Sequence, residues 1–332
     1  MTNTPSGAQF VGSMSAAADF LGNGAIEVNM YETEIFDLVR RSSPVMERLP
    51  AVRANGHPHR YFEETAIGLG QFTDPRTIAY SPTSPTRVER FVPIKAMVNG
   101  SNFGLFDVQV TKQQGQFSYV EAKDVEDIVN GIQVVRCQKI WQGADTSMAT
   151  PTSVEYFGIL NQVTQQATIA SGASIIDGLK AQVAAMVART DVVVRPTAIY
   201  VNPVLGDYID REAKASYIEM NTVTVAGVQV SALQTQAGLL PLISEPFLPA
   251  PTGALYNFGA PPGGLKNYLA VILTEGAVLR PYIDGGAGSG LPQLFQLGLV
   301  GDLQAKFMAV MFDAVLVKGP GYAHSVVAVQ RT

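Results

Sequence analysis

The sequence predicts an α+β fold in which strands from both ends of the chain form one lobe and a second lobe is inserted between them. Two observations carry this prediction. A long helical pattern at Tyr119–Gln142 is preceded by strand-like residues and followed, near the C-terminus, by long strand-like segments. Between them, residues 175–283 mix shorter helices with short strands, which is the element pattern of an α+β lobe.

Composition favours a protein whose surface is largely interface. Of the 332 residues, 47% are hydrophobic and only 15% are charged, whereas soluble domains carry about 25% charged residues. Interface cores are depleted in charge, although a large globular core lowers the charged fraction as well. The net charge of −5 and the absence of a basic residue before Arg40 exclude a tight nucleic-acid binder and an N-terminal arm that neutralises phosphates.

Cysteine usage and the apolar runs indicate the cellular compartment. Cys137 is the only cysteine, so an intrachain disulfide is excluded. The sequence contains no run of 18 apolar residues, and residues 1–18 carry no charge; this pattern predicts neither a membrane span nor a secretory signal. We therefore expect a cytosolic chain.

The N-terminal third lacks a core of its own. Residues 1–30 are rich in Ala, Gly, Ser and Asn without a sustained period, which predicts an extended arm that gains order only on another surface. Tyr31–Leu49 favours a short helix, which Pro44 must bend or split.

Residues 51–95 predict a long two-stranded arm. Apolar and polar residues alternate at Val88–Ile94, and Ser81–Pro85 supplies a Pro-rich bend. Charges of both signs lie on the arm: Arg53, Arg60, Arg76, Arg87, Arg90, Lys95, Glu63, Glu64, Asp74 and Glu89. Two strands alone are marginal in water, so we expect the arm to pack on something else.

The long helix at Tyr119–Gln142 follows a predicted strand at Phe103–Val110. Its apolar residues recur at helical spacing: Val125, Ile128, Val129, Ile132 and Val135. Acidic residues crowd its first half and basic residues its second half, which matches the helix dipole. Gly131 interrupts the middle of this pattern and weakens the helix there.

The remaining elements are shorter. Ile175–Arg189 predicts a helix with one apolar stripe, Thr197–Val201 a buried strand, and Asn202-Pro203 the cap and first position of a helix to about Lys214. Further strand candidates are Thr222–Leu233, Leu240–Leu248, Ala254–Phe258, Tyr268–Ile283, Leu294–Val317 and Tyr322–Val329. A glycine-rich loop at residues 283–290 separates the inserted lobe from the last strands.

No residue pattern supports an enzyme or a cofactor. His57 and His59 lack a third metal ligand nearby, and we expect them to be exposed. The Gly286–Gly290 segment lacks the lysine of a phosphate loop. Cys137 and Trp141 fit helix packing better than chemistry, and the carboxylates Asp207, Asp210 and Glu212 fit a solvated helix face.

The order of the predicted elements along the chain resembles that of a known fold. The residues with most weight are Val120–Trp141, Tyr156–Asn161, and the run Ile175–Lys214 with its Ala198-Ile199-Tyr200-Val201-Asn202-Pro203 segment. This order resembles the Hong Kong 97-like fold of tailed-bacteriophage major capsid proteins. The resemblance covers nearly the whole chain, and architecture carries it rather than a short motif.

The resemblance implies a division of the chain. By this resemblance, residues 1–30 form an N-terminal arm, residues 31–50 a short helix of the peripheral domain and residues 51–95 the E-loop. Residues 96–151 would form the peripheral domain with the spine helix 119–142, residues 152–290 the axial domain, and residues 291–332 the peripheral-domain strands. The implied function is self-assembly, as pentamers and hexamers, into an icosahedral head around double-stranded DNA, with no catalysis and no sequence-specific DNA binding.

Partners and location follow from the same resemblance. Some relatives join subunits by Lys–Asn cross-links, but Lys95 is the only lysine in or beside this E-loop; non-covalent locking or a separate cement protein is therefore expected. The short arm implies a separate scaffolding protein, unless processing has already removed an N-terminal scaffolding segment, and a head implies a portal. The chain would assemble in the bacterial cytoplasm and reside in the virion capsid.

The expected assembly interface lies on the E-loop. Its residues are Arg60, Phe62, Arg87, Arg90, Phe91 and Val92. Gly131 is the expected hinge of the spine helix during shell expansion, because glycine in a helix interior permits bending. Two alternatives remain open: an encapsulin-like compartment shell of the same fold, and a soluble hydrolase or ligand-binding protein, for which no nucleophile elbow or phosphate loop is found.

Overall fold

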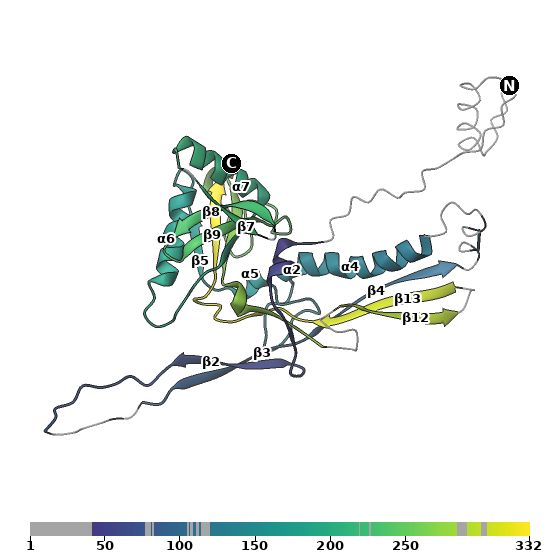
Figure 1. The fold of residues 1–332 in the computed structure, drawn as a ribbon, viewed down its shortest axis with the longest axis horizontal. Coiled ribbons are helices and arrows are strands. Elements are labelled where there is room, and N and C mark those ends of the chain that lie inside the picture. The colour runs from purple at the N-terminus through teal and green to yellow at the C-terminus, as the bar shows by residue number, and fades with distance from the viewer. Residues whose placement is uncertain are drawn as a thin grey trace, which may run out of the picture.

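The chain folds into two lobes and a projecting hairpin (Figure 1). The computed structural model describes residues 42–76, 81, 83–104, 106, 109–110, 113, 120–218, 220–225, 227–283, 291–299 and 304–332. The expected N-terminal arm, residues 31–41 of the first helix and the glycine-rich loop at 284–290 lie outside these residues. The described part of the first helix is α2 (Pro44–Arg48), which begins at Pro44 instead of being split by it, because proline fits the first helical position.

A seven-stranded sheet forms the first lobe, in the order β5-β15-β10-β6-β9-β8-β7. Its strands are β5 (Gln166–Ile169), β6 (Ala198–Val201), β7 (Asn221–Val225), β8 (Val228–Thr235), β9 (Gly238–Ser244), β10 (Lys266–Leu273) and β15 (Ser325–Arg331). Both faces of this sheet are covered. Because side chains alternate along a strand, successive residues of β10 pack on opposite sides of the sheet. Ala270 and Ile272 of β10 face the core beneath α6 (Ile175–Val187) and α7 (Pro203–Ala215), whereas Leu269 and Val271 face Trp141 and α5 (Ile159–Gln162).

Side-chain caps explain where the two lobe helices begin. The Ser174 hydroxyl accepts a hydrogen bond from Asp177 N at 3.1 Å. The Asn202 side chain accepts one from Val204 N at 3.0 Å, and Pro203 occupies the first turn of α7. These caps satisfy amides that have no partner within the helix, and they confirm the predicted start of α7.

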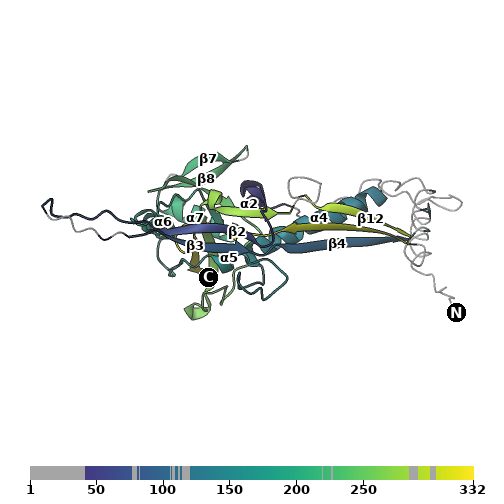
Figure 2. The same ribbon diagram turned by 90° about the horizontal axis from the view of Figure 1, so that it is seen from below.

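A six-stranded sheet and the long helix form the second lobe. The helix α4 (Val120–Gln142) lies along a ribbon made by β4 (Lys95–Gly104), β13 (Gln304–Asp313) and β12 (Gln293–Leu299) (Figures 1 and 2). Ile128 and Ile132 of α4 pack on Ala309 and Met311 of β13. The sheet is completed by β1 (Ala51–Arg53), β11 (Val278–Tyr282) and β14 (Leu316–Val317).

The antiparallel pairing of β4 with β13 joins residues at least 200 positions apart. It runs from Lys95 opposite Asp313 to Gly104 opposite Gln304. This pairing confirms that strands before the long helix and strands near the C-terminus share one sheet.

The strands predicted at Thr222–Leu233, Tyr268–Ile283 and Leu294–Val317 are each divided into shorter strands: β7 and β8, β10 and β11, and β12, β13 and β14. Three further strand predictions differ from the structure. The strand predicted at Phe103–Val110 is β4, which ends at Gly104, and Phe106 is already helical; the register with β13 sets its ends. Residues 254–258 form only an isolated bridge between Leu255 and Phe258. The last strand, β15, belongs to the seven-stranded sheet instead of the C-terminal strands of the other lobe, because it pairs with β10 and β5.

Candidate assembly interface

The hairpin formed by β2 (His59–Ala66) and β3 (Thr86–Val92) exposes most of its residues. The two strands make a separate two-stranded sheet, and in both ribbon views the loop end of the hairpin extends beyond the lobes (Figures 1 and 2). Antiparallel pairing joins His59 to Val92 at the base and Ala66 to Thr86 at the far end. The expected two-stranded arm is therefore present, while β1 and β4 at its two ends belong to the six-stranded sheet.

Strand alternation divides the hairpin into two faces. Because side chains on a strand point alternately to opposite sides, the paired residues separate into two sets. The outward face consists of Arg60, Phe62, Glu64, Arg87, Glu89 and Phe91. The inward face consists of His59, Tyr61, Glu63, Val88, Arg90 and Val92. Four of the six expected interface residues thus share the outward face, and Arg90 and Val92 do not.

The outward face mixes charges with an exposed aromatic side chain. Arg60 pairs with Glu89 at 2.8 Å and Arg87 with Glu64 at 3.3 Å, and the Arg60 guanidinium lies 5.9 Å from the centroid of the Phe91 ring. Phe62 is 72% exposed between these pairs. Exposed ion pairs contribute little to stability, so this face can exchange its pairs for contacts with another molecule at small cost.

Val92 is a core residue of its own chain. It is 2% exposed and packs with Ile94, Ala314 and Leu316. The expectation that it lies at an interface is therefore wrong for the described fold. The sequence places Val92 beside Phe91, but one step along a strand reverses the direction of the side chain.

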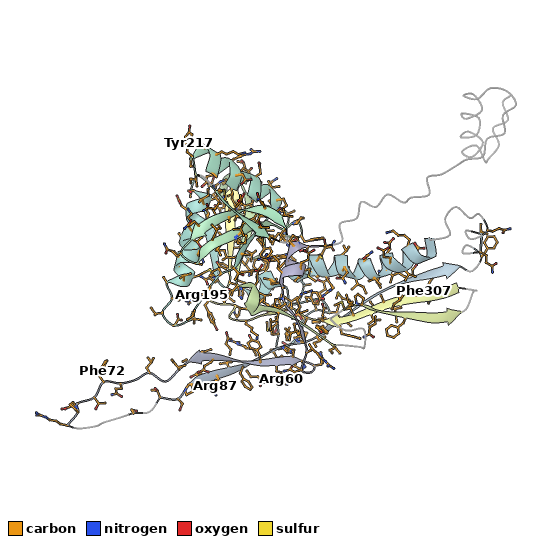
Figure 3. All side chains as sticks on the ribbon, viewed as in Figure 1. Arg60, Phe72, Arg87, Arg195, Tyr217 and Phe307 are labelled. Atoms are coloured by element: carbon orange, nitrogen blue, oxygen red, sulfur yellow. The ribbon has the colours of Figure 1, made fainter. Side chains whose placement is uncertain are left out.

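The end of the hairpin carries apolar side chains that the sequence analysis missed. Ile67 is 66% exposed, Leu69 is 77% exposed and Phe72 is fully exposed, and Figure 3 shows Phe72 beyond the ends of both strands. We call Ile67, Leu69 and Phe72 the apolar tip. The signal in the sequence was a run of large apolar residues separated by Gly68 and Gly70, which neither strand nor helix periodicity explains.

Gly131, the expected hinge, lies under a side chain from β4. A Cβ atom at this position would come within 2.5 Å of Asn99 Nδ2. That amide donates a hydrogen bond of 2.8 Å to Ile128 O in the preceding turn of α4. Glycine here therefore allows close approach between the helix and the strand, which gives it a packing role in this state.

Two buried carboxylates hold distant elements together. Arg136 of α4 binds Asp313 of β13 at 3.0 Å, and the Tyr156 hydroxyl also donates to Asp313; burial raises the pKa of Asp313, while Arg136 opposes this rise. Glu245 accepts hydrogen bonds from the Ser43 hydroxyl and from Val45 N at the start of α2. Burial likewise raises the pKa of Glu245.

The other residues singled out in the sequence have structural roles. Cys137 is buried, and burial raises the pKa of its thiol to about 11, which disfavours a reactive thiolate. His59 is buried rather than exposed. Glu212 does not lie on a solvated face, because it accepts hydrogen bonds from Ser174 Oγ, Ile175 N and Ile176 N at the start of α6. Asp207 pairs with Arg211 at 2.6 Å.

The described residues hold no group of three or more His, Cys, Asp or Glu side chains that could bind a metal ion. In the same part of the chain, no helix is both long enough and apolar enough to cross a membrane.

Comparison with known proteins identifies the fold. No family model and no curated protein matches the chain. Among solved structures, the capsid of cyanophage A-1(L) has a TM-score of 0.62 at 12% identity, over 98% of this chain and 99% of that chain. The capsid of a native GTA particle has a TM-score of 0.62 at 9% identity, over 96% and 98%. The chain has the Hong Kong 97-like capsid fold.

A shell protein of another kind has the same fold. The holo-SrpI encapsulin complex from Synechococcus elongatus PCC 7942 has a TM-score of 0.58 at 15% identity, over 94% of each chain. In this chain the Hong Kong 97-like fold includes both lobes, the long helix α4 and the β2–β3 hairpin.

Proposed function

We propose that the chain is the major capsid protein of a tailed bacteriophage. Many copies would assemble, as pentamers and hexamers, into an icosahedral head that encloses double-stranded DNA. The fold supports this proposal, because proteins with nearly the same extent of chain are capsid subunits. The chain would act as a structural subunit and would catalyse no reaction.

The observation that carries the proposal is the hairpin with its apolar tip. Contiguous exposed apolar residues on a soluble protein usually mark a protein contact. Ile67, Leu69 and Phe72 lie at the far end of an element that extends beyond both lobes, so a second copy can cover them. A contact between different surfaces of identical subunits repeats around a ring or shell, which is the arrangement that a capsid needs.

The partners follow from the same function. We infer a separate scaffolding protein for assembly, a portal for DNA entry, and a cement protein or non-covalent locking in place of covalent cross-links. DNA would be enclosed without sequence-specific contacts, because the chain carries a net charge of −5. Assembly in the bacterial cytoplasm and residence in the virion capsid complete the proposal.

An encapsulin-like compartment shell is the second candidate, and the match to an encapsulin complex over 94% of each chain favours it. The contents of particles separate the two functions. The purified protein should form closed particles of uniform size in electron micrographs, and particles from infected cells should contain nuclease-protected DNA. Particles that hold an enzyme and no DNA would support the compartment, and a monodisperse monomer under all assembly conditions would contradict both.

A further inference from the structure

The base of the hairpin is attached to its own chain through the inward face. The Tyr322 hydroxyl donates a hydrogen bond to Glu63 Oε1, and Arg90 Nε donates to the other oxygen of this carboxylate at 3.1 Å. The Glu63 side chain is only 9% exposed. Because it is shielded from water, this carboxylate interacts more strongly with its partners than the exposed pairs of the outward face do.

A second contact lies beside the first. Lys318 Nζ is 5.3 Å from the centroid of the Tyr61 ring, within the range of a cation–π interaction. Tyr61 also packs against the cluster that contains Val92 and Leu316. Burial raises the pKa of the Tyr61 hydroxyl to about 12, so this ring stays neutral at any physiological pH.

Lys318 and Tyr322 belong to the turn that connects the two sheets. Residues 318–324 run from β14 in the six-stranded sheet to β15 in the seven-stranded sheet. Gly319 has a φ of +63°, and a Cβ atom there would lie 2.6 Å from Tyr322 Cε2. Glycine adopts this conformation without strain, and because it has no Cβ atom, Gly319 allows the turn to pack closely against the Tyr322 ring.

The opposite side of the turn is fixed by the seven-stranded lobe. The Arg189 guanidinium lies 5.8 Å from the centroid of the Tyr322 ring, and Arg189 Nη1 donates a hydrogen bond of 3.0 Å to Gly321 O. The Tyr322 ring is thus held by Arg189 of the seven-stranded lobe, and its hydroxyl group contacts Glu63 of the hairpin.

We propose that Tyr322 and Glu63 are positioning residues that set the direction of the hairpin before a second copy binds. An isolated two-stranded hairpin is marginally stable in water, so attachment at its base decides how many directions it samples. A hairpin that already points in its binding direction loses less conformational entropy on association. The consequence for assembly rests on the proposed capsid function, whereas the direction of the hairpin is a property of the single chain.

Amide hydrogen exchange of the soluble, unassembled chain tests the positioning directly. Tyr322→Phe keeps the ring beneath Arg189 and removes only the hydroxyl group. Exchange should accelerate about fivefold across β2 and β3, the factor expected for loss of one net hydrogen bond, while β10 and β15 keep their exchange rates. Glu64→Gln is the matched control, since it removes the neighbouring carboxylate on the outward face and should leave exchange at the hairpin base unchanged.

Two results would overturn the proposal. One is equal protection of the hairpin in Tyr322→Phe and the parent chain; the other is acceleration throughout the seven-stranded sheet, which would make Tyr322 a residue of general stability. Glu63→Gln provides a second variant and should give the same local acceleration. Because exchange is measured on unassembled protein, its outcome is independent of whether the chain forms shells. If shells do form, Tyr322→Phe should raise the protein concentration needed for assembly several-fold.

Discussion

At the scale of residues, apolar side chains on the two faces of the hairpin have opposite roles. Phe62 is exposed on the outward face of the hairpin, whereas Val92, at the base on the inward face, is buried in the core of its own chain. Hydrophobicity alone does not separate these two side chains. Their environments differ because the strand register fixes which face each residue occupies.

Charged substitutions at these two positions should therefore differ in their effects. Val92→Asp buries an unpaired carboxylate, which costs several kcal/mol, and the soluble subunit should lose its cooperative unfolding transition or unfold at a much lower temperature. Phe62→Asp should leave the unfolding temperature within a few degrees of the parent and reduce shell formation. Circular dichroism melting and sedimentation measure the two effects, and equal destabilisation by both variants would contradict the division into faces.

Gly131 offers a second prediction at this scale. In a helix interior, alanine is more favourable than glycine by about 1 kcal/mol, but Gly131→Ala would displace Asn99 from Ile128 O, which costs about 1 kcal/mol. The single variant should therefore change stability little. In an Asn99→Ala background the same substitution should stabilise the chain by about 1 kcal/mol, as a double-mutant cycle in urea would show.

The cycle and shell expansion test different properties of Gly131. Identical effects of Gly131→Ala in both backgrounds would exclude the contact with Asn99 as the reason for glycine. The proposed hinge role predicts in addition that Gly131→Ala shifts the conditions under which a precursor shell expands.

His324 links stability to pH. It is buried where β15 begins, its Nδ1 accepts a hydrogen bond from Thr274 N at 3.3 Å, and its Nε2 lies 3.0 Å from Lys318 O. A ring that accepts at one nitrogen and donates at the other is neutral, and burial lowers the pKa of His324 to about 4. The unfolded chain binds this proton near pH 6.5, so stability is fully present above pH 6.5 and is lost as pH falls towards 4.

We expect this single group to destabilise the fold by about 3 kcal/mol between pH 7 and pH 4. Urea unfolding of the parent and of His324→Gln at several pH values measures the effect, and the variant should show a smaller decrease. His57→Gln, at an exposed position of the hairpin base, is the control and should retain the decrease of the parent. A parent and a His324 variant with the same pH profile would refute this assignment.

At the scale of elements, the β2–β3 hairpin combines a fixed base with an exposed end. Its base is attached through Tyr61, Glu63 and Val92, and its far end carries the apolar tip. Contacts at the base stabilise the subunit. Contacts at the tip are available only to another molecule, because the tip extends beyond both lobes.

Polar substitution of the tip should separate folding from assembly. The triple variant Ile67→Ser, Leu69→Ser, Phe72→Ser exposes no buried surface, so its unfolding temperature should match that of the parent. Loss of three apolar anchors should abolish particles or raise the concentration required for them at least tenfold. Gln71→Ser, a polar position between the anchors, should assemble as the parent does; normal assembly of the triple variant would rule the tip out as a subunit contact.

At the scale of the whole molecule, local signals and the sharing of one sheet by strands from both ends of the chain could be predicted from the sequence, whereas the exact partners and register of most strands could not. The Asn202-Pro203 cap and the helix α4 depend on residues close together in the chain, and the structure confirms both, although Val135 of the expected apolar stripe is 44% exposed. The run Val326–Val329 is buried at every position, so its pattern indicates a strand without indicating which sheet it joins. The faces of the hairpin depend on the register between β2 and β3, and its apolar tip follows no period at all.

The proposed function requires that the apolar tip joins copies of this chain into a closed shell. A cryo-electron microscopy reconstruction of particles assembled from the purified protein tests it most directly. We expect a closed icosahedral shell in which Phe72 of each subunit is buried against a neighbouring copy. A shell in which Ile67, Leu69 and Phe72 remain in solvent, or a protein that stays monomeric under every assembly condition, would contradict it.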